Sequence, residues 1–545
     1  MQKYYETWKF KHPQPSDFRK IWEADSLNIG GVSWFFDDLI GSTKQVDYKI
    51  TDLKKDDKNW KVTVKNVGKV AVPFTVSAVK GDSAVFTTRV FGVPVGGETV
   101  VFIPKKEGVS MITVDYRKLL PDVNRSNNNI KTSGLLPKME PLRFKLGVGL
   151  GHSQKTTIYG MPIIATNAYD KFMVGAWLHN GAIPLKSFEW SLAPMYSTGT
   201  KSLSGLGNIN YNFFAGNNKI NLGVGARRFA FDFNQKFQTT RAYDRVTPSV
   251  SVEFRGNPGS IFTSKLQLRH IFIGEQGFLY DTTGNLRGKQ RETNGITELT
   301  YSGVIKNALS NTSFKIALEG QSYKDNFDRN QSYQRATLEF KKDFMYQRNK
   351  RLYARVFMGG FLKNTREKGG GLYGRDNRGS LGLVSNGSTD YRYDGLFIGR
   401  NEQTGLGSQQ IDPTTEGGMK FVLPKGATTS LGFSNSFVAS LNLKMDLPVN
   451  LPRFLQLKPY FDIGYFADKR PLPSDQTTLM SGGIAWEFFG EAAAIYFPVY
   501  FNGQTEDPNS FRSTAVTQRG KYIERITFSL DLRKLNVLNI MKNLF

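Results

Sequence analysis

The sequence contains no cysteine among its 545 residues. Disulfides and thiolate metal sites are therefore excluded, and any metal would need histidine and carboxylate ligands. Long apolar runs are also missing, since the longest, residues 492–501, contains Pro498 and is about half the roughly 20 residues that a membrane-spanning helix needs. The sequence therefore predicts no helical membrane span.

Histidine is scarce, and the four histidines are far apart. None of His12, His152, His179 and His270 has a second histidine at the spacing of a metal site. We expect His12 to pack or cap beside Pro13 and the other three to lie on strands or at strand ends. We predict no catalytic, cofactor-binding or metal-binding residue in this chain.

The net charge of +25 raises the question of nucleic-acid binding. Lysine and arginine are nevertheless dispersed along the chain rather than gathered into one stripe or basic tail. We therefore expect no nucleic-acid partner. Dispersed positive charge fits lipopolysaccharide and outer-membrane lipid as partners, or a charged lumen, with a merely solvated surface as the alternative.

An alternation of apolar and polar residues recurs along most of the chain. Every second residue from 437 to 447 is apolar and those between are mostly polar, and residues 314–319 and 526–533 repeat the pattern. Strands of this kind, with abundant glycine and aromatic residues, predict a transmembrane β-barrel. Leu443→Arg should then cost about 2–4 kcal/mol near mid-bilayer, whereas Asn442→Arg should be tolerated.

The alternation predicts about sixteen strands, an even number of the kind found in bacterial barrels. They lie near residues 157, 172, 188, 203, 219, 245, 261, 293, 312, 332, 352, 434, 455, 477, 493 and 523. Long connections should follow odd strands, at 232–243, 274–292, 365–432 and 503–521, and short ones even strands, at 216–218, 257–259, 307–311 and 348–350. Because extracellular loops are long and periplasmic turns short, the N-terminal domains should be periplasmic.

The predicted fold class is mainly β, in several regions. Residues 1–45 should be helical, with Ser16 as an N-cap; 46–130 should form an Ig-like β-sandwich and 131–141 a linker; and 142–545 should form the barrel. Residues 1–10 lack the apolar region of a signal peptide. Either export information lies upstream, or the barrel prediction is wrong.

Two N-terminal segments carry a family resemblance. Residues 7–18, Thr-Trp-Lys-Phe-Lys-His-Pro-Gln-Pro-Ser-Asp-Phe, and residues 33–39, Ser-Trp-Phe-Phe-Asp-Asp-Leu, resemble the C-terminal helical part of M1-family zinc aminopeptidases, the gluzincins. The resemblance covers roughly the first tenth of the chain and implies a catalytic zinc domain encoded upstream. The His-Glu-x-x-His motif of that family is absent here, so we expect no activity from this chain alone.

Two further segments resemble known modules. Residues 66–74 and 121–128 are similar to Ig-like adhesion modules of bacterial secreted proteins, which are usually spacers. Residues 390–400 and 416–418, within the long 365–432 connection, resemble barrel-like tails of some Bacteroidota M1 peptidases. This connection, which also holds Gly369–Gly371 and Arg375–Arg378, is interpreted as a lumenal plug or an external contact surface, with a solvated loop as the alternative.

Two glycine-rich stretches favour bends in barrel strands over a phosphate-binding loop. The residues at 147–151 and 223–225 lie in strand-like alternation with no helix following. Three functions remain open: an outer-membrane anchor for an M1-like metallopeptidase that admits peptides to it, a porin-like channel with accessory domains, and a soluble all-β adhesin.

Overall fold

A computed structural model gives the structure of most of the chain. It describes all residues except 1, 26–30, 135–136, 138–141, 150–154, 182–185, 235–237, 257–258, 281–285, 325–329, 366–378, 403, 422–431, 453, 468–476, 489–491, 503–521 and 532–545. The contacts divide the chain into two compact units, residues 1–159 with 182–184, and residues 160–181 with 185–545. This division falls later in the chain than residue 142, where the sequence predicts the barrel to begin.

The N-terminal unit begins with three short helices, α1 (Gln2–Trp8), α2 (Pro15–Asp25) and the π-helix η2 (Trp34–Ile40). Helix α2 starts at a proline, whose fixed φ suits the first helical position. The Asp17 carboxylate accepts a hydrogen bond from the Gln14 backbone N–H at 2.9 Å. Ser16 therefore lies inside the first turn, and its prediction as the N-cap is wrong.

Two antiparallel sheets follow the helices and form a β-sandwich. The strands are β1 (Tyr48–Lys55), β2 (Asn59–Asn66), β3 (Phe74–Lys80), β4 (Ser83–Val90), β5 (Glu98–Pro104), β6 (Met111–Val114) and β7 (Asn129–Lys131), with the 3-10 helix η3 (Arg125–Asn128) before β7. One sheet has the order β1-β2-β5 and the other β4-β3-β6-β7. Alternate residues such as Val62, Val64, Val76 and Ile112 are fully buried in a shared core.

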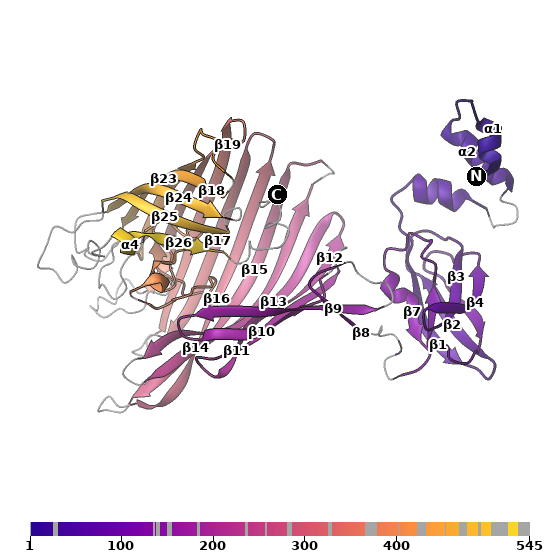
Figure 1. Ribbon diagram of the computed structural model, residues 1–545, viewed down its shortest axis with the longest axis horizontal. Coiled ribbons are helices and arrows are strands. Elements are labelled where there is room, and N and C mark those ends of the chain that lie inside the picture. Colours follow the sequence, from indigo (N-terminus) through magenta and orange to yellow (C-terminus); the bar gives the residue numbers. More distant parts are fainter. Residues whose placement is uncertain are drawn as a thin grey trace, which may run out of the picture. The chain divides into compact units, whose positions relative to one another are not determined.

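Seventeen strands form the large sheet, and their order closes it into a barrel (Figure 1). They are β8 (Leu142–Leu146), β9 (Thr156–Asn167), β10 (Lys171–His179), β11 (Phe188–Ser197), β12 (Ser202–Ala215), β13 (Asn218–Asn234), β14 (Thr239–Arg255), β15 (Phe262–Tyr280), β16 (Leu286–Lys306), β17 (Asn311–Lys324), β18 (Asn330–Gln347), β19 (Lys350–Asn364), β22 (Phe437–Met445), β23 (Gln456–Ala467), β24 (Thr478–Phe488), β25 (Ala493–Phe501) and β26 (Thr527–Leu530).

The predicted fold class is confirmed, with one strand more than predicted. Each of the sixteen predicted positions lies in, or within a few residues of, a strand from β9 to β19 or from β22 to β26. The additional strand is β8, which has five residues and follows the linker. An odd number of strands results, so the expectation of an even number is wrong.

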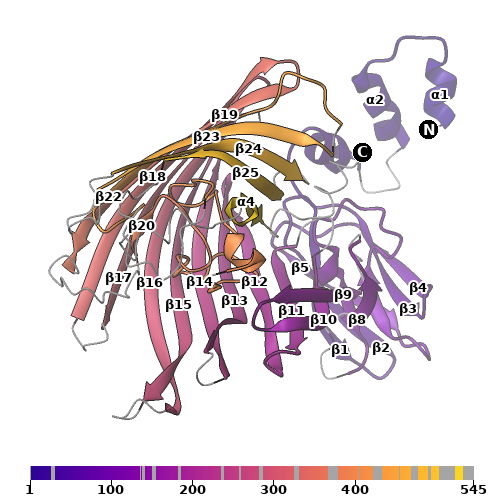
Figure 2. The ribbon, with the colours of Figure 1, turned by 60° about the vertical axis from the view of Figure 1, so that its left-hand side comes forward.

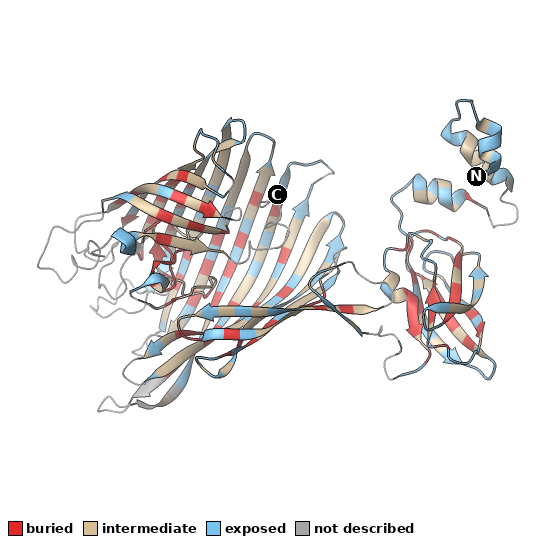
Figure 3. Ribbon diagram, in the orientation of Figure 1, coloured by how far each residue is buried: buried red, intermediate tan, exposed pale blue. Residues whose placement is uncertain are grey.

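Buried and exposed residues alternate along the barrel strands (Figure 3). The exposed residues are mainly apolar and many of the buried ones are polar, the reverse of a soluble sandwich. On β17, Ile316 and Leu318 are 44% and 45% exposed, whereas Glu319, which points to the inside of the barrel, is 5% exposed. On β22, Ser440 and Asn442 are buried while the apolar residues between them are half-exposed. The outside of the barrel is therefore apolar, whereas its inside combines polar and charged residues with apolar patches.

Two of the predicted long connections are much shorter than predicted. Strands β13 to β16 continue through 232–234 and 239–243, and through 274–280 and 286–292, as paired ladders. Most of their residues are polar or glycine, a composition that predicts a loop, but backbone pairing extends these strands. The long connections are 365–436 and 502–526, which lie at the same end of the barrel because consecutive strands alternate in direction. The connection 446–455 lies at the other end, so segregation by length is weaker than predicted.

Short elements occur within the connections. They are β20 (Leu381–Gly382), η5 (Leu406–Gln409), β21 (Phe433–Ser434) and α4 (Tyr522–Arg525). In Figure 2, the orange chain that contains β20 lies between the barrel walls. Among the residues that the structure describes, every helix is too short or too polar to serve as a membrane span.

Candidate functional site

The connection between β19 and β22 turns back into the barrel lumen. Its described residues 379–421, without 403, are called the lumenal segment below. At its base, β20 pairs with β21 through Leu381 and Ser434. The Met419 backbone N–H donates to the Leu383 carbonyl at 3.0 Å, so the two ends of the segment lie side by side. Contacts with the wall agree with the plug interpretation and not with a solvated loop or an external surface.

Apolar side chains seat the lumenal segment in two clusters. One joins segment residues to the wall of β19 and β22 to β25: Leu381, Leu383, Val384, Ile411, Met419 and Phe421 with Phe357, Val438, Tyr460, Phe466, Leu479, Ala485, Ala494 and Tyr496. The other packs Tyr393 against Met173, Met195, Phe229, Phe231, Tyr243, Ile271, Ile273 and Ile296. These wall residues are buried because the segment covers them.

Four charged wall residues stand directly across from one another on neighbouring strands. Arg269 on β15 pairs in register with Glu298 on β16, Glu298 with Glu319 on β17, and Glu319 with Arg335 on β18. Directly opposed residues on one face of a sheet lie close together. The four residues therefore form a continuous charged belt along the inner wall, from β15 to β18. The two adjacent glutamates would repel each other unless cations lie beside them.

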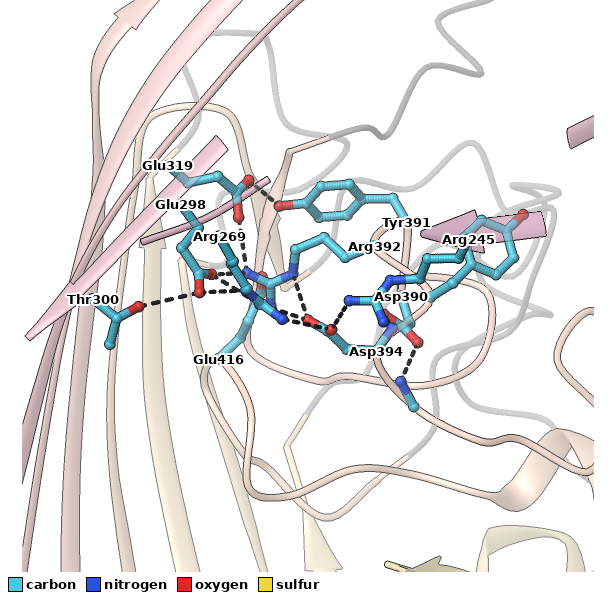
Figure 4. A network of polar contacts seen from close by, with 12 residues as sticks. Arg245, Arg269, Glu298, Thr300, Glu319, Asp390, Tyr391, Arg392, Asp394 and Glu416 are labelled. Carbon is cyan, nitrogen blue, oxygen red and sulfur yellow. Dashed lines mark hydrogen bonds and ion pairs between the residues drawn. The ribbon is translucent and has the colours of Figure 1, made fainter. Parts of the chain in front are cut away.

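The lumenal segment supplies one of those cations (Figure 4). The Arg392 guanidinium donates from Nη1 to Glu298 Oε2 at 3.1 Å and to Glu319 Oε2 at 2.8 Å. The Tyr391 hydroxyl also donates to Glu319. Arg335 binds Glu319 from the wall and Glu416 Oε1 from the segment, the latter at 3.1 Å. Both glutamates of the belt are thus neutralised by guanidinium groups.

Asp394 forms the second half of this network. Its carboxylate accepts two hydrogen bonds from Arg269, both 2.9 Å long, and one of 2.6 Å from Arg245. Burial alone would raise the pKa of Asp394, but the positive charges of Arg269, Arg245 and Arg392 hold this pKa well below its usual value. Asp394 is therefore an anion in the folded protein.

An arginine within the segment fixes the turn that presents these groups. The Arg400 guanidinium donates to Asp390 Oδ2 at 3.1 Å and to the Gly395 carbonyl at 2.7 Å. It also lies 4.5 Å from the ring centroid of Tyr393, which stacks on Tyr243 at 4.0 Å. The turn is therefore held internally as well as by the wall.

A cavity of about 690 Å³ lies between the segment and the walls. Its lining is both apolar and charged and includes Arg227, Arg245, Lys341, Arg355, Asp394, Phe397, Lys420, Lys444 and Tyr496. A volume of this size is within the range of small-molecule sites. The segment therefore occupies part of the lumen and leaves a cavity beside it.

The histidines are not brought together. His12 is exposed in a loop, His179 is buried at the end of β10, and His270 lies on β15, where its Nδ1 is 2.8 Å from Thr297 Oγ1. His152 lies outside the described residues. No group of three or more potential metal ligands occurs in the part of the chain that the structure describes. Gly223 and Gly225 lie inside β13, while residues 369–371 and 375–378 are outside the described residues.

The sequence indicated part of this site. It placed Glu319 on the polar face of a strand and singled out residues 390–400 and 416–418. It did not identify Arg269, Glu298 or Arg335 as partners. A usable signal exists, because charged residues recur on the polar face of strands whose other face is apolar.

Comparisons with known proteins give structural likeness only. No family model matches the chain and no curated protein matches it, so the resemblance to M1 peptidases and to their Bacteroidota members stays a prediction. CdiB from Escherichia coli is 9% identical, with 66% of this chain and 64% of that chain covered and a TM-score of 0.35. BamA from Haemophilus ducreyi lacking POTRA domains 1-3 is 10% identical, with 95% and 93% covered and a TM-score of 0.37.

CdiB from Acinetobacter baumannii is 8% identical, with a TM-score of 0.32, and this chain spans 61% of its length. The chain thus spans less than two thirds of both CdiB proteins. TM-scores this low carry no argument about function. The chain is accordingly similar to these proteins in being a large barrel, and its function has to be inferred from its own lumen and surface.

Proposed function

We propose that this chain is an outer-membrane β-barrel whose lumen is closed by its own lumenal segment, and that it anchors the domains that precede the barrel. The observation that carries the proposal is that two kinds of contact hold the segment against the wall: two apolar clusters, and the buried network around Glu319 and Asp394. A loop that opened readily would not bury charges on both sides of its contact.

The outer surface supports the membrane assignment. Strands β9 to β19 and β22 to β25 have nine or more residues each, enough to cross a bilayer when tilted. Their outward residues include exposed large apolar side chains on every side, for example Leu203, Leu268, Leu318 and Ile484. Exposed apolar area of this extent is costly in water and is solvated by acyl chains in a bilayer.

The connections support an orientation. The ends that carry 365–436 and 502–526 are expected outside the cell, because extracellular loops of such barrels are the long ones. Strand β9, the first that is long enough to cross, starts at the opposite end. The N-terminal domains are accordingly proposed to be periplasmic. Their resemblance to the tail of M1 peptidases makes a zinc peptidase encoded upstream the proposed cargo.

Planar-bilayer recording tests the closed lumen. The purified chain is expected to insert without ohmic conductance, whereas a chain whose residues 385–417 are replaced by a short Gly-Ser linker should conduct. The linker is feasible because Leu383 and Met419 are hydrogen-bonded to each other. Large steady conductance from the unmodified chain would overturn the anchor proposal.

Fractionation tests the anchoring. A site for a specific protease inserted at residues 131–141 should release the N-terminal domains into the periplasmic fraction while the barrel stays with the outer membrane. Retention of both halves in the soluble fraction would contradict the membrane assignment itself.

The second candidate function is a conduit that opens on demand. It is favoured by the cavity of about 690 Å³ beside the segment, which an inert anchor does not require. A conduit predicts that the unmodified chain conducts after addition of a specific solute, and the anchor predicts that it does not.

A further inference from the structure

Three wall arginines converge on one point of the lumen. Arg227 on β13 stands directly across from Arg245 on β14, and Arg269 follows on β15. Like charges directly opposed on one face of a sheet destabilise each other. An arrangement of this kind is stable only when an anion lies between the guanidinium groups. We call Arg227, Arg245 and Arg269 the arginine clamp.

Asp394 of the lumenal segment is the anion that occupies the clamp (Figure 4). Its carboxylate binds Arg269 with two parallel bonds of 2.9 Å and Arg245 with one of 2.6 Å. Arg227 donates to the Asp394 carbonyl at 3.1 Å. A fork of two bonds from one guanidinium is the geometry with which arginine recognises carboxylate and phosphate groups in general.

The clamp is incompletely satisfied by this occupant. The Arg245 side chain is only 6% exposed, and its Nε has no hydrogen-bond partner among the residues that the structure describes. Within the described residues, Asp394 is the only carboxylate that pairs with Arg245. Arg269, in contrast, also pairs with Glu298 on the wall. If Asp394 left, Arg245 would be a buried cation without a counter-ion, which is strongly unfavourable.

The clamp is also reachable. Arg227, Arg245 and Asp394 all line the cavity of about 690 Å³, so a solute inside it touches the clamp without crossing the segment. Among the other cations of the lining, Lys341 pairs with Glu339, Lys420 with Asp462 and Lys444 with Glu487. The clamp, whose Arg245 pairs with the segment rather than with the wall, is therefore the part of the lining that a small anion can contest.

We propose that the arginine clamp is a binding site for the carboxylate or phosphate group of a small anionic solute, and that Asp394 is its built-in competitor. The solute enters the cavity and replaces the Asp394 carboxylate on Arg245 and Arg269. This inference goes beyond the anchoring function, since a closed barrel needs neither the cavity nor an exchangeable anion.

Isothermal titration of the purified full chain in detergent with citrate and with inorganic phosphate tests the site. Removing the competitor should strengthen binding, so Asp394→Asn is expected to bind citrate at least tenfold more tightly than the unmodified chain. Asp394→Asn combined with Arg245→Gln should lose that gain. Asp412→Asn is the matched control, because Asp412 also lines the cavity but its carboxylate bonds to Thr414 rather than to an arginine.

A second variant keeps the test decisive if Asp394→Asn does not fold. The chain with residues 385–417 replaced by a linker lacks the competitor altogether and should bind citrate in a manner that requires Arg245 but not the outward-facing Arg228, which pairs with Asp244. Equal affinity of Asp394→Asn and Asp412→Asn, or binding that survives Arg245→Gln, would overturn the proposal. Because the readout is binding, this result is independent of whether the barrel conducts.

Discussion

Glu319 shows how a full charge is kept inside the barrel. Its side chain is 3% exposed, and it contacts Arg335 at 2% exposure and Arg392 at 16%. The hydroxyl of Tyr333 donates to it at 2.8 Å. Removing a carboxylate from water costs several kcal/mol, which is offset only when its oxygens are hydrogen-bonded and its charge is balanced. The arrangement therefore depends on all its members at once.

Replacing this carboxylate should be costly. Glu319→Gln removes the negative charge that balances the buried guanidinium groups of Arg335 and Arg392. The free energy of unfolding should therefore fall by about 3–5 kcal/mol. Urea unfolding of the vesicle-reconstituted protein measures the change. Glu253→Gln is the control: its partner Arg255 is 44% exposed, so the loss should be below about 1 kcal/mol. Similar losses for the two variants would argue against a buried network.

Acid should release the lumenal segment. The pKa of Asp394 is lower in the folded protein than in the unfolded chain, so its contribution to stability is complete above its unfolded pKa of about 4 and is lost as the pH falls through the folded value. Bilayer recordings across a pH series should therefore find the barrel closed from pH 8 to about 4. Opening already between pH 7 and 5 would mean that another group holds the segment.

At the scale of the strand, the two faces should tolerate charge differently. Leu268 on β15 is 45% exposed and faces outward, whereas its neighbour Gln267 faces the lumen. Leu268→Arg should cost about 2–4 kcal/mol if it lies near mid-bilayer, and Gln267→Arg much less. Heat-modifiable gel mobility and the midpoint of urea unfolding can be measured for both variants. Equal effects of the two substitutions would contradict the membrane assignment.

The inward face is not uniformly tolerant, and this corrects the expectation for Asn442. Its side chain accepts a bond from Arg355 at 2.9 Å and donates to Asp462 at 3.0 Å, and it is 7% exposed. Asn442→Arg would place a second guanidinium beside Arg355. We therefore expect Asn442→Arg to destabilise the barrel, although the position of Asn442 on the polar face predicts that it is tolerated.

The wall leaves space for the segment at a glycine. A Cβ on Gly464 of β23 would lie 2.4 Å from Leu383 Cδ2 and 2.8 Å from the Met419 sulfur. Gly464→Val should therefore dislodge the base of the segment and produce conductance in a bilayer. Gly482→Val on β24 is the control, because a Cβ there meets its nearest atom at 3.5 Å. A closed Gly464→Val barrel would show that the segment is seated independently of Leu383.

At the scale of the whole molecule, the absence of cysteine makes the orientation measurable. A single cysteine at Thr198, in the turn after β11, lies at the end of the barrel that carries 365–436, whereas one at Leu309, after β16, lies at the opposite end. An impermeant maleimide should label Thr198→Cys but neither Leu309→Cys nor Ser83→Cys in intact cells. The reverse pattern would invert the proposed orientation.

How far the sequence predicts this molecule depends on the range of each interaction. The positions of β9 to β19 and β22 to β26 follow from alternation within single strands, a local property. Strand β8 has only five residues, which are too few to show an alternation. Where β13 to β16 extend, most residues are polar or glycine and do not alternate, so the sequence predicts loops there although backbone pairing continues.

The sequence by itself determined the two-faced strands, and with them a barrel that is apolar outside and polar within. Only the tertiary structure decided that the lumenal segment folds against the inner wall of the barrel. Arg392 binds Glu298 and Glu319, which lie 94 and 73 residues away along the chain. No local pattern specifies such partners, because they are set by the register of neighbouring strands and by the path of the segment between them.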